Sequence, residues 1–309
     1  MENLVVTSSP FIHSSNDVNK MFLYTSMALM FPAIYGVMFF GMSCLIHLLV
    51  SVASCFLFEA LFNVINKKKF FVDDVSFMVT GLILALTMPY KISYFIVIGC
   101  AFFAIFVVKM AFGGLGRNVV NPALAGRCLA GLISAGAASE FYQFTLNGET
   151  MLSLTQGGTN TISNLLVGEA VGGIGTTSVL ILLGCYIFLV YAGVIDFKIP
   201  LLSILAYFVV GLTLNGLETN VLNMFSGSFI FVSVFMMTEP NISPNTFLGK
   251  VIYSLAFGAL SAIVWNIGKL GENSVFVVAL FVNMFVPIMD KYLVIKPWKL
   301  GGVRNAYKN

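Results

Sequence analysis

Charged side chains are scarce in this chain of 309 residues. Asp, Glu, Lys and Arg make up 9% of it, whereas apolar residues make up 59%. So little charge cannot cover the surface of a water-soluble domain, and a mean hydropathy of +0.96 agrees. The composition therefore excludes a soluble globular protein and predicts an all-α polytopic membrane protein embedded in the lipid bilayer. No basic patch interleaved with aromatic residues is present, which excludes nucleic acid as a partner.

Cysteine motifs are absent as well. The five cysteines stand alone in apolar runs, without the C-x-x-C or Cys/His spacing of a metal site: Cys44, Cys55, Cys100, Cys128 and Cys185. A metal ligand shared with a partner chain is one interpretation, but we interpret them as small buried apolar residues. No glycine fingerprint lies between a strand and a helix, so the sequence gives no sign of a NAD-binding domain. We predict no catalytic residue and no metal ligand in this chain.

Ten apolar runs follow a polar N-terminal segment, 1–20, which lacks the basic start and short apolar core of a cleavable signal peptide. The third and eighth runs are short and end in proline, at Pro89 and Pro240. Each run is a candidate transmembrane helix: 21–41, 43–63, 75–89, 93–112, 120–138, 177–195, 199–217, 223–238, 248–267 and 273–290.

Lysine and arginine positions predict the orientation. With the N-terminus inside, the internal connections and the tail at 291–309 hold nearly all the basic residues, and the external connections hold only Lys91 and Lys269. Both termini are therefore expected in the cytoplasm, with the chain in a bacterial or archaeal plasma membrane. The connection at 139–176 contains no Lys or Arg and is expected outside. A connection this long is generally functional.

A repeated motif divides the chain into two halves. The stretches "GGLGRNVVNPALAGRCL", from Gly113, and "GKLGENSVFVVALFVNM", from Gly268, share the frame G-x-L-G-x-N just before a helix, and each follows a short helix ending in Thr-x-Pro. One copy is expected inside and the other outside, which predicts two inverted five-helix repeats, 21–138 and 177–290. Glycine- and proline-broken segments at matching positions mark the site in such folds. Ordinary loops between helices are the alternative.

Four stretches resemble the NqrB/RnfD family, the membrane subunits of sodium-pumping NADH:quinone reductase and of the Rnf ferredoxin:NAD oxidoreductase. The Rnf branch fits better, because the first helix begins near Met21 without the longer N-terminal extension of the quinone-reductase subunit. The four stretches are "DVSFMVTGLILALTMP" (Asp74–Pro89), "KMAFGGLGRNVVNPALAGR" (Lys109–Arg127), "LLVGEAVGGIGTTSVLILLGCYIF" (Leu165–Phe188) and "MMTEPNISPNTFLGKVIYSLAFGAL" (Met236–Leu260).

The resemblance implies a covalently bound flavin mononucleotide (FMN), joined through its phosphate to a threonine of the outer connection by a flavin transferase. The family motif, Asp-x-x-Ser/Thr-Gly-Ala-Thr, aligns with "FTLNGET" and places Gly148 and Thr150 at the glycine and attachment positions. Here Phe144, Asn147 and Glu149 replace three motif residues. A weaker candidate is Thr159, in "QGGTNT".

The resemblance also implies a second, non-covalent flavin or riboflavin, held by Asn118 and Asn121 of the glycine loop. Glu59 falls within the second apolar run and is predicted to take part in cation coupling, because an ionisable group inside a membrane is functional by default. Lys109 and Arg127 flank the glycine loop, where they could neutralise a reduced flavin or anchor at the membrane interface, and we predict interfacial anchoring.

The function that the resemblance implies is that of a flavin-carrying redox subunit working with other Rnf-type subunits, coupled to Na+ or H+ movement. The flavin would carry out the electron transfer, and the protein would position it. Two alternatives stay open: the corresponding subunit of the quinone reductase, and a flavin-free transporter or channel with the same inverted repeat.

Overall fold

The computed structural model describes residues 18–66, 75–89, 92–114, 116–134, 173–268 and 272–293. Its regular elements over these ranges are helices, which confirms the predicted all-α polytopic class. In chain order they are α1 (Val18–Phe40), α2 (Met42–Ile65), α3 (Ser76–Thr87), α4 (Tyr94–Phe102) continuing as the π-helix η1 (Phe103–Met110), α5 (Pro122–Ser134), α9 (Val179–Tyr191), α10 (Lys198–Leu214), α11 (Leu217–Met224), α12 (Ser228–Phe231) continuing as the π-helix η3 (Val232–Met236), α13 (Phe247–Gly268), α14 (Glu272–Met284) and α15 (Val286–Leu293).

Each of the ten predicted runs contains a helix, but the helices differ in length. Within the described ranges, four helical segments are long and apolar enough to cross a membrane. A fifth is obtained if α11 and the α12–η3 helix, which meet at a bend of 52°, form one span. The sequence did not predict α11 as a separate helix. Helix length alone therefore accounts for four or five crossings rather than ten, and the remaining apolar helices are shorter.

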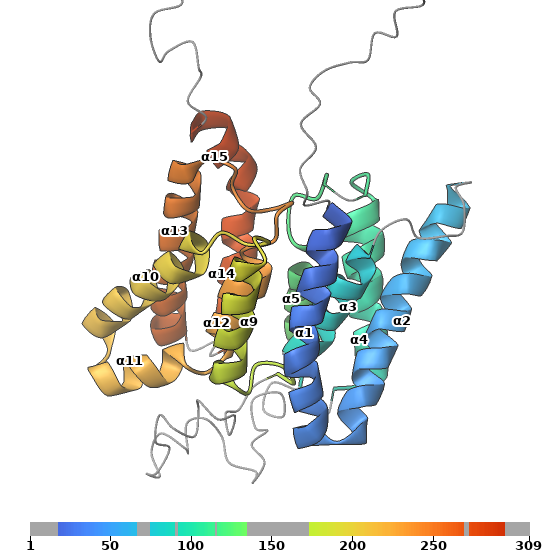
Figure 1. Ribbon diagram of the computed structural model, residues 1–309, viewed down its shortest axis with the longest axis horizontal. Coiled ribbons are helices and arrows are strands. Elements are labelled where there is room, and N and C mark those ends of the chain that lie inside the picture. Colours follow the sequence, from blue (N-terminus) through green and yellow to red (C-terminus); the bar gives the residue numbers. More distant parts are fainter. Residues whose placement is uncertain are drawn as a thin grey trace, which may run out of the picture.

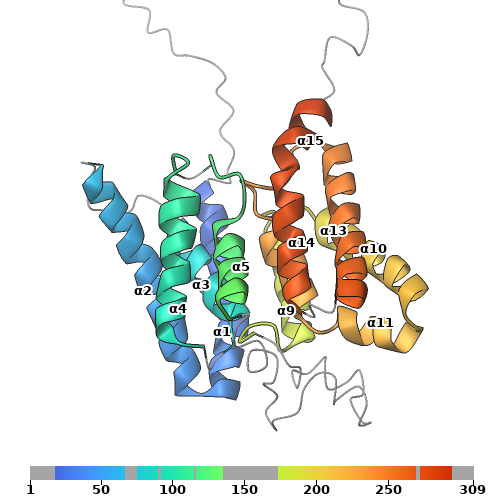
Figure 2. The same ribbon diagram turned by 180° about the vertical axis from the view of Figure 1, so that it is seen from behind.

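The helices form two halves that meet along a seam (Figure 1). On one face of the seam α1 packs against α9, and Figure 2 shows α5 beside α14 on the other. The α1–α9 pair is antiparallel, because Gly36 lies against Ile174 at one end and the rings of Tyr24 and Phe188 are 6.5 Å apart at the other. Helices at equivalent positions thus run in opposite directions, as an inverted repeat requires.

Each half also contains a pair of parallel neighbours, α2 beside α4–η1 and α10 beside α13. In the second half, Lys198 lies over the ring of Phe247 where both helices begin, and Asn215 donates to Asn266 where both end. The halves therefore share helix order and packing. The predicted boundaries of the outer connection stay predictions, because 135–172 lies outside the described residues.

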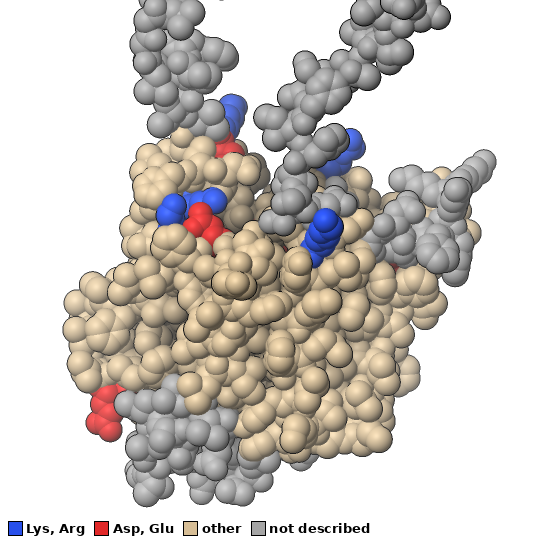
Figure 3. All heavy atoms as spheres, in the orientation of Figure 1, with Lys and Arg blue, Asp and Glu red and all other residues tan. Residues whose placement is uncertain are grey.

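The five cysteines lie in or against the two apolar clusters of the core. Four are buried and Cys128 is partly buried, and all five carry free thiols. This burial supports their interpretation as small apolar residues. Most of the charged groups visible in Figure 3 gather toward the end where α10 and α13 begin and α15 ends, above a broad uncharged surface, and an acidic group lies at the opposite end.

Close packing of α13 on α10 depends on Gly258. A Cβ atom there would lie 2.2 Å from the Ser203 carbonyl oxygen and 3.0 Å from the Tyr207 nitrogen. Both are backbone atoms and cannot rotate away, so we expect Gly258→Ala to destabilise the protein by about 1–3 kcal/mol. The matched control is Gly184→Ala on α9, where a Cβ meets nothing within 4 Å. Alanine favours helices by about 1 kcal/mol over glycine, so this control should melt no lower than the wild type. Equal melting temperatures of both variants in detergent would contradict the packing described.

Candidate functional site

The glycine loop between η1 and α5 needs its glycines for backbone conformation. Gly113, Gly114 and Gly116 have φ angles of 111°, 91° and 81°, a region that side chains disfavour. The Gly114 N–H donates to the Lys109 carbonyl at 3.1 Å. The Asn118 amide, with its nitrogen toward the loop, donates to the Lys109 and Gly114 carbonyls at 3.1 and 3.2 Å. The loop thereby satisfies its own backbone where the helix is broken.

Asn121 joins the glycine loop to the second half of the chain. Its Oδ1 accepts the Leu124 N–H at 3.0 Å, which caps α5, and Pro122 occupies the first helical position. Its Nδ2 donates to Glu239 Oε2 at 2.5 Å. Glu239 lies in the Thr-x-Pro segment that follows η3. A buried amide of the first repeat therefore contacts the proline-ended break of the second.

Arg127 makes the reciprocal connection. Its Nε donates to the Thr87 carbonyl at the end of α3, and its Nη2 donates to Asn273 Oδ1 of the second glycine motif, both at 2.9 Å. The guanidinium carbon lies 4.4 Å from the centroid of the Phe276 ring. Arg127 is only 3% exposed, so the predicted interfacial anchoring is wrong. Because α3 ends inside the protein, the Thr87 carbonyl requires a hydrogen-bond donor from the protein itself, and Arg127 supplies it.

The predicted interfacial anchoring of Lys109 is also wrong, because Lys109 is only 1% exposed. Its ammonium donates to both carboxylate oxygens of Glu59 on α2, at 2.7 and 2.6 Å, and to Ser76 Oγ at 2.6 Å. Lys109 lies in the last turn of η1, and π-helical segments are frequent at functional sites. Glu59, the predicted coupling residue, is therefore one partner of a buried ion pair.

These contacts bring three residues singled out from the sequence, Glu59, Asn118 and Asn121, around Lys109. The Lys109 carbonyl accepts from Asn118 and its ammonium binds Glu59, while Asn121 donates to Glu239. We name Glu59, Lys109, Asn118, Asn121 and Glu239 the polar cluster. Glu239 was not among the site residues predicted from the sequence, although its Thr-x-Pro segment matches the break after α3.

The predicted flavin-attachment residues lie elsewhere. Thr150, its neighbour Gly148 and the alternative Thr159 fall outside the described residues. Within the described part of the chain, no group of three or more His, Cys, Asp or Glu side chains could hold a metal ion.

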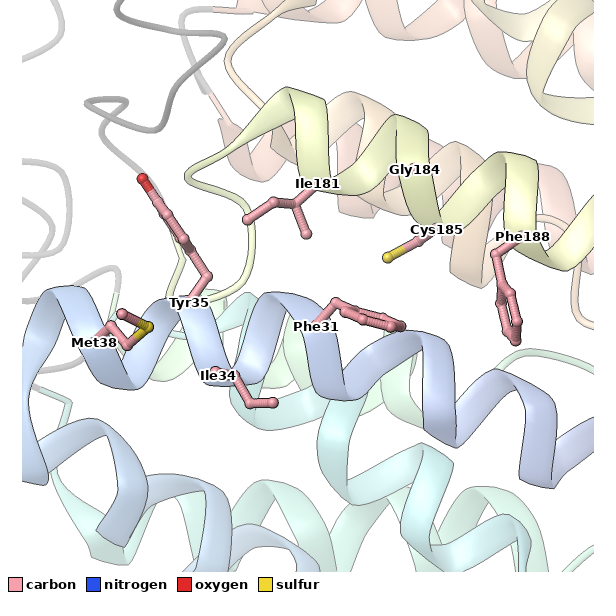
Figure 4. A pocket seen from close by; sticks show the side chains of 8 residues that line it. All are labelled: Phe31, Ile34, Tyr35, Met38, Ile181, Gly184, Cys185 and Phe188. Carbon is pink, nitrogen blue, oxygen red and sulfur yellow. The ribbon is translucent and has the colours of Figure 1, made fainter.

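Two cavities lie along the seam between the halves. Figure 4 shows an open apolar groove of about 470 Å³ between α1 and α9, lined by Phe31, Ile34, Tyr35, Met38, Ile181, Gly184, Cys185 and Phe188. A smaller cavity of about 20 Å³ is lined in part by Thr25, Thr238 and Glu239, which is room for one water molecule. Neither is lined by Asn118 or Asn121. Both amides already bind protein partners, so a flavin ring could bind them only in place of those partners.

Comparison with known proteins identifies the family. The model of the NQR2, RnfD, RnfE family matches residues 5–299. The chain is 28% identical to the D subunit of the Na(+)-translocating ferredoxin:NAD(+) oxidoreductase complex of Acetobacterium woodii, over 94% of this chain and 93% of the relative. It is 27% identical to the D subunit of the proton-translocating ferredoxin:NAD(+) oxidoreductase complex of Clostridium ljungdahlii, over 96% of each. The chain therefore belongs to the NQR2, RnfD, RnfE family.

Proposed function

We propose that this chain is the flavin-carrying D-type membrane subunit of an Rnf-type complex, which transfers electrons between ferredoxin and NAD and couples this transfer to Na+ or H+ translocation. The observation that supports this proposal is similarity to the D subunits of two ferredoxin:NAD(+) oxidoreductase complexes, over at least 93% of every chain compared. The two relatives are named for different ions, so the coupling ion of this chain stays open between Na+ and H+.

In this proposal the Thr150 hydroxyl holds FMN through its phosphate, after attachment by a flavin transferase on the outer side of the membrane. Bound FMN would supply an electron carrier to the membrane part of the complex. Ferredoxin and NAD would react on partner subunits. The polar cluster supports a coupling role for Glu59, since an acid paired inside a membrane protein can exchange partners when a cation or proton arrives.

Orientation is part of the proposal. We place both termini in the cytoplasm and 139–176 outside, on the strength of the basic-residue bias. An exported reporter fused to the C-terminal tail would contradict this placement.

Affinity purification of the tagged chain from its native membranes tests the proposed function. We expect redox subunits to copurify, together with ferredoxin:NAD oxidoreductase activity and flavin fluorescence that survives denaturation. NADH:quinone reductase activity in the same preparation would instead favour the quinone-reductase alternative. A chain purified alone and without flavin from cells that contain the transferase would favour a flavin-free transporter.

The second flavin leads to a prediction about the glycine-loop amides. Asn118→Leu and Asn121→Leu should each lower the extracted non-covalent flavin severalfold while leaving covalent flavin in place, because an unpaired polar group in a dry site costs about 1–3 kcal/mol. Asn121→Leu also removes the α5 cap, which costs about 1 kcal/mol. Melting temperatures must therefore accompany the flavin assay.

Asn266→Leu is the matched control, because it removes an amide near the opposite end of the molecule that bonds Asn215. It should leave extracted flavin unchanged. Lowered stability with unchanged flavin in both loop variants would restrict Asn118 and Asn121 to the structural contacts described above.

A further inference from the structure

The parallel helices α10 and α13 begin side by side and bring two lysines together. The Lys198 ammonium lies 4.9 Å from the centroid of the Phe247 ring and 5.7 Å from that of Phe197. The Lys250 ammonium lies 3.0 Å from Asp196 Oδ2. Among the described residues, no carboxylate lies within ion-pair distance of Lys198, whose ammonium is held by aromatic faces instead.

Asp196 is fully engaged by its two neighbours. Its Oδ2 accepts from the Lys250 ammonium, and its Oδ1 accepts the Lys198 backbone N–H at 3.2 Å. Partial burial alone would raise the pKa of Asp196. The Lys250 and Lys198 hydrogen bonds and the charges of both lysines outweigh that effect and hold the pKa below its ordinary value. One carboxylate thus binds one ammonium group, that of Lys250, and the second lysine leaves the patch with a net positive charge.

The surface next to these lysines is apolar. Phe197 and Phe247 are 50% and 65% exposed. Along α10 and α13 the exposed surface continues with aliphatic side chains, away from the charged end: Leu201, Leu205, Val209, Leu248, Ile252 and Leu255. Aromatic residues with lysines above an aliphatic band are typical of the boundary between headgroups and hydrocarbon. Figure 3 shows this change from charged to uncharged surface.

We propose that this patch, defined as Asp196, Phe197, Lys198, Phe247 and Lys250, binds the phosphate headgroup of an anionic phospholipid, with its acyl chains along α10 and α13. We choose a phosphate headgroup as the occupant because its negative charge complements the positive charge of the two lysines. Lysine binds phosphate as a point charge. The positive ends of both helix dipoles add to the same potential. An acidic protein segment would also have to cover the exposed aliphatic side chains of α10 and α13. The acyl chains of a lipid fit that surface already. This inference does not rest on the proposed redox function.

The test uses the full chain in lipid nanodiscs made of phosphatidylglycerol and phosphatidylcholine, with the retained lipids counted by mass spectrometry. The wild type should retain phosphatidylglycerol preferentially. Lys198→Gln should lower that preference roughly fivefold, the contribution of one basic residue near a membrane surface. Lys198→Arg should preserve it. Asp196→Asn should raise it, because the competing carboxylate charge is removed.

Lys291→Gln is the matched control. Lys291 lies in α15, and its ammonium is 5.6 Å from the centroid of the Tyr292 ring. Its substitution should lower the preference by less than that of Lys198, because Lys291 lies outside the patch. An equal loss in Lys291→Gln, or full preference in Lys198→Gln, would overturn the proposal. If inorganic phosphate raises the melting temperature as much as phosphatidylglycerol does, the patch is an anion site and not a lipid site.

Discussion

Replacing Lys109 by methionine is expected to cause the largest loss of stability among the substitutions considered. The Glu59 carboxylate would stay buried without the ammonium that binds both its oxygens. Removal of one partner of a buried ion pair costs about 3–5 kcal/mol, because the other charge is left uncompensated. The measurement is the apparent melting temperature of the purified protein in detergent, compared with that of Lys291→Met at the exposed end of the last helix.

The double variant Glu59→Leu with Lys109→Met separates structure from coupling. It removes both charges and replaces them with apolar groups, which is often neutral for stability. We expect it to melt close to the wild type but to lose ion-coupled transport in the assembled complex. A double variant that stays as unstable as the single one would contradict the ion-pair account. Recovery of both stability and transport would remove Glu59 from the coupling mechanism.

Substitution of Thr150 by valine is expected to abolish covalent flavin. The phosphothreonyl bond requires the hydroxyl, and valine keeps the shape of the side chain without it. Gly148 permits close approach of the transferase. The readout is flavin fluorescence in a denaturing gel, from cells that contain a competent transferase, with the bound peptide mapped by mass spectrometry.

Thr159→Val is the control for that experiment, since it removes the other candidate hydroxyl of the same connection. It should keep full fluorescence. Loss of fluorescence in Thr159→Val alone would move the attachment site to Thr159. Departures from the family motif at Phe144 and Glu149 make this comparison necessary, because a phosphate beside Glu149 adds like charge.

Local backbone signals predicted much of the fold. Three glycines of the first motif have positive φ angles, and two short helices end at Thr-x-Pro, so the features that define the repeat are local ones. Their recurrence in inverted register predicted that the broken segments mark a site. In the structure the broken segments of the two halves are joined by the hydrogen bonds of Asn121 with Glu239 and of Arg127 with Asn273.

Tertiary contacts account for what the sequence could not predict. Lys109 and Arg127 flank the glycine loop, Lys109 in the last turn of η1 and Arg127 in the second turn of α5, and a lysine or arginine beside such a break usually anchors at the interface. Their burial depends on Glu59 and on the Thr87 carbonyl, which approach from helices distant in the sequence. The separate helix α11 was missed because residues 218–222, which include Glu218 and Asn220, lie in the polar connection between the predicted runs 199–217 and 223–238.

We propose that this chain carries flavin as a subunit of a redox complex. An intact-mass measurement of the chain, taken from the complex purified out of native membranes, is the test of this proposal. We expect one covalent flavin mononucleotide on every copy, lost in Thr150→Val. An unmodified mass in a preparation whose cells contain an active flavin transferase would contradict it.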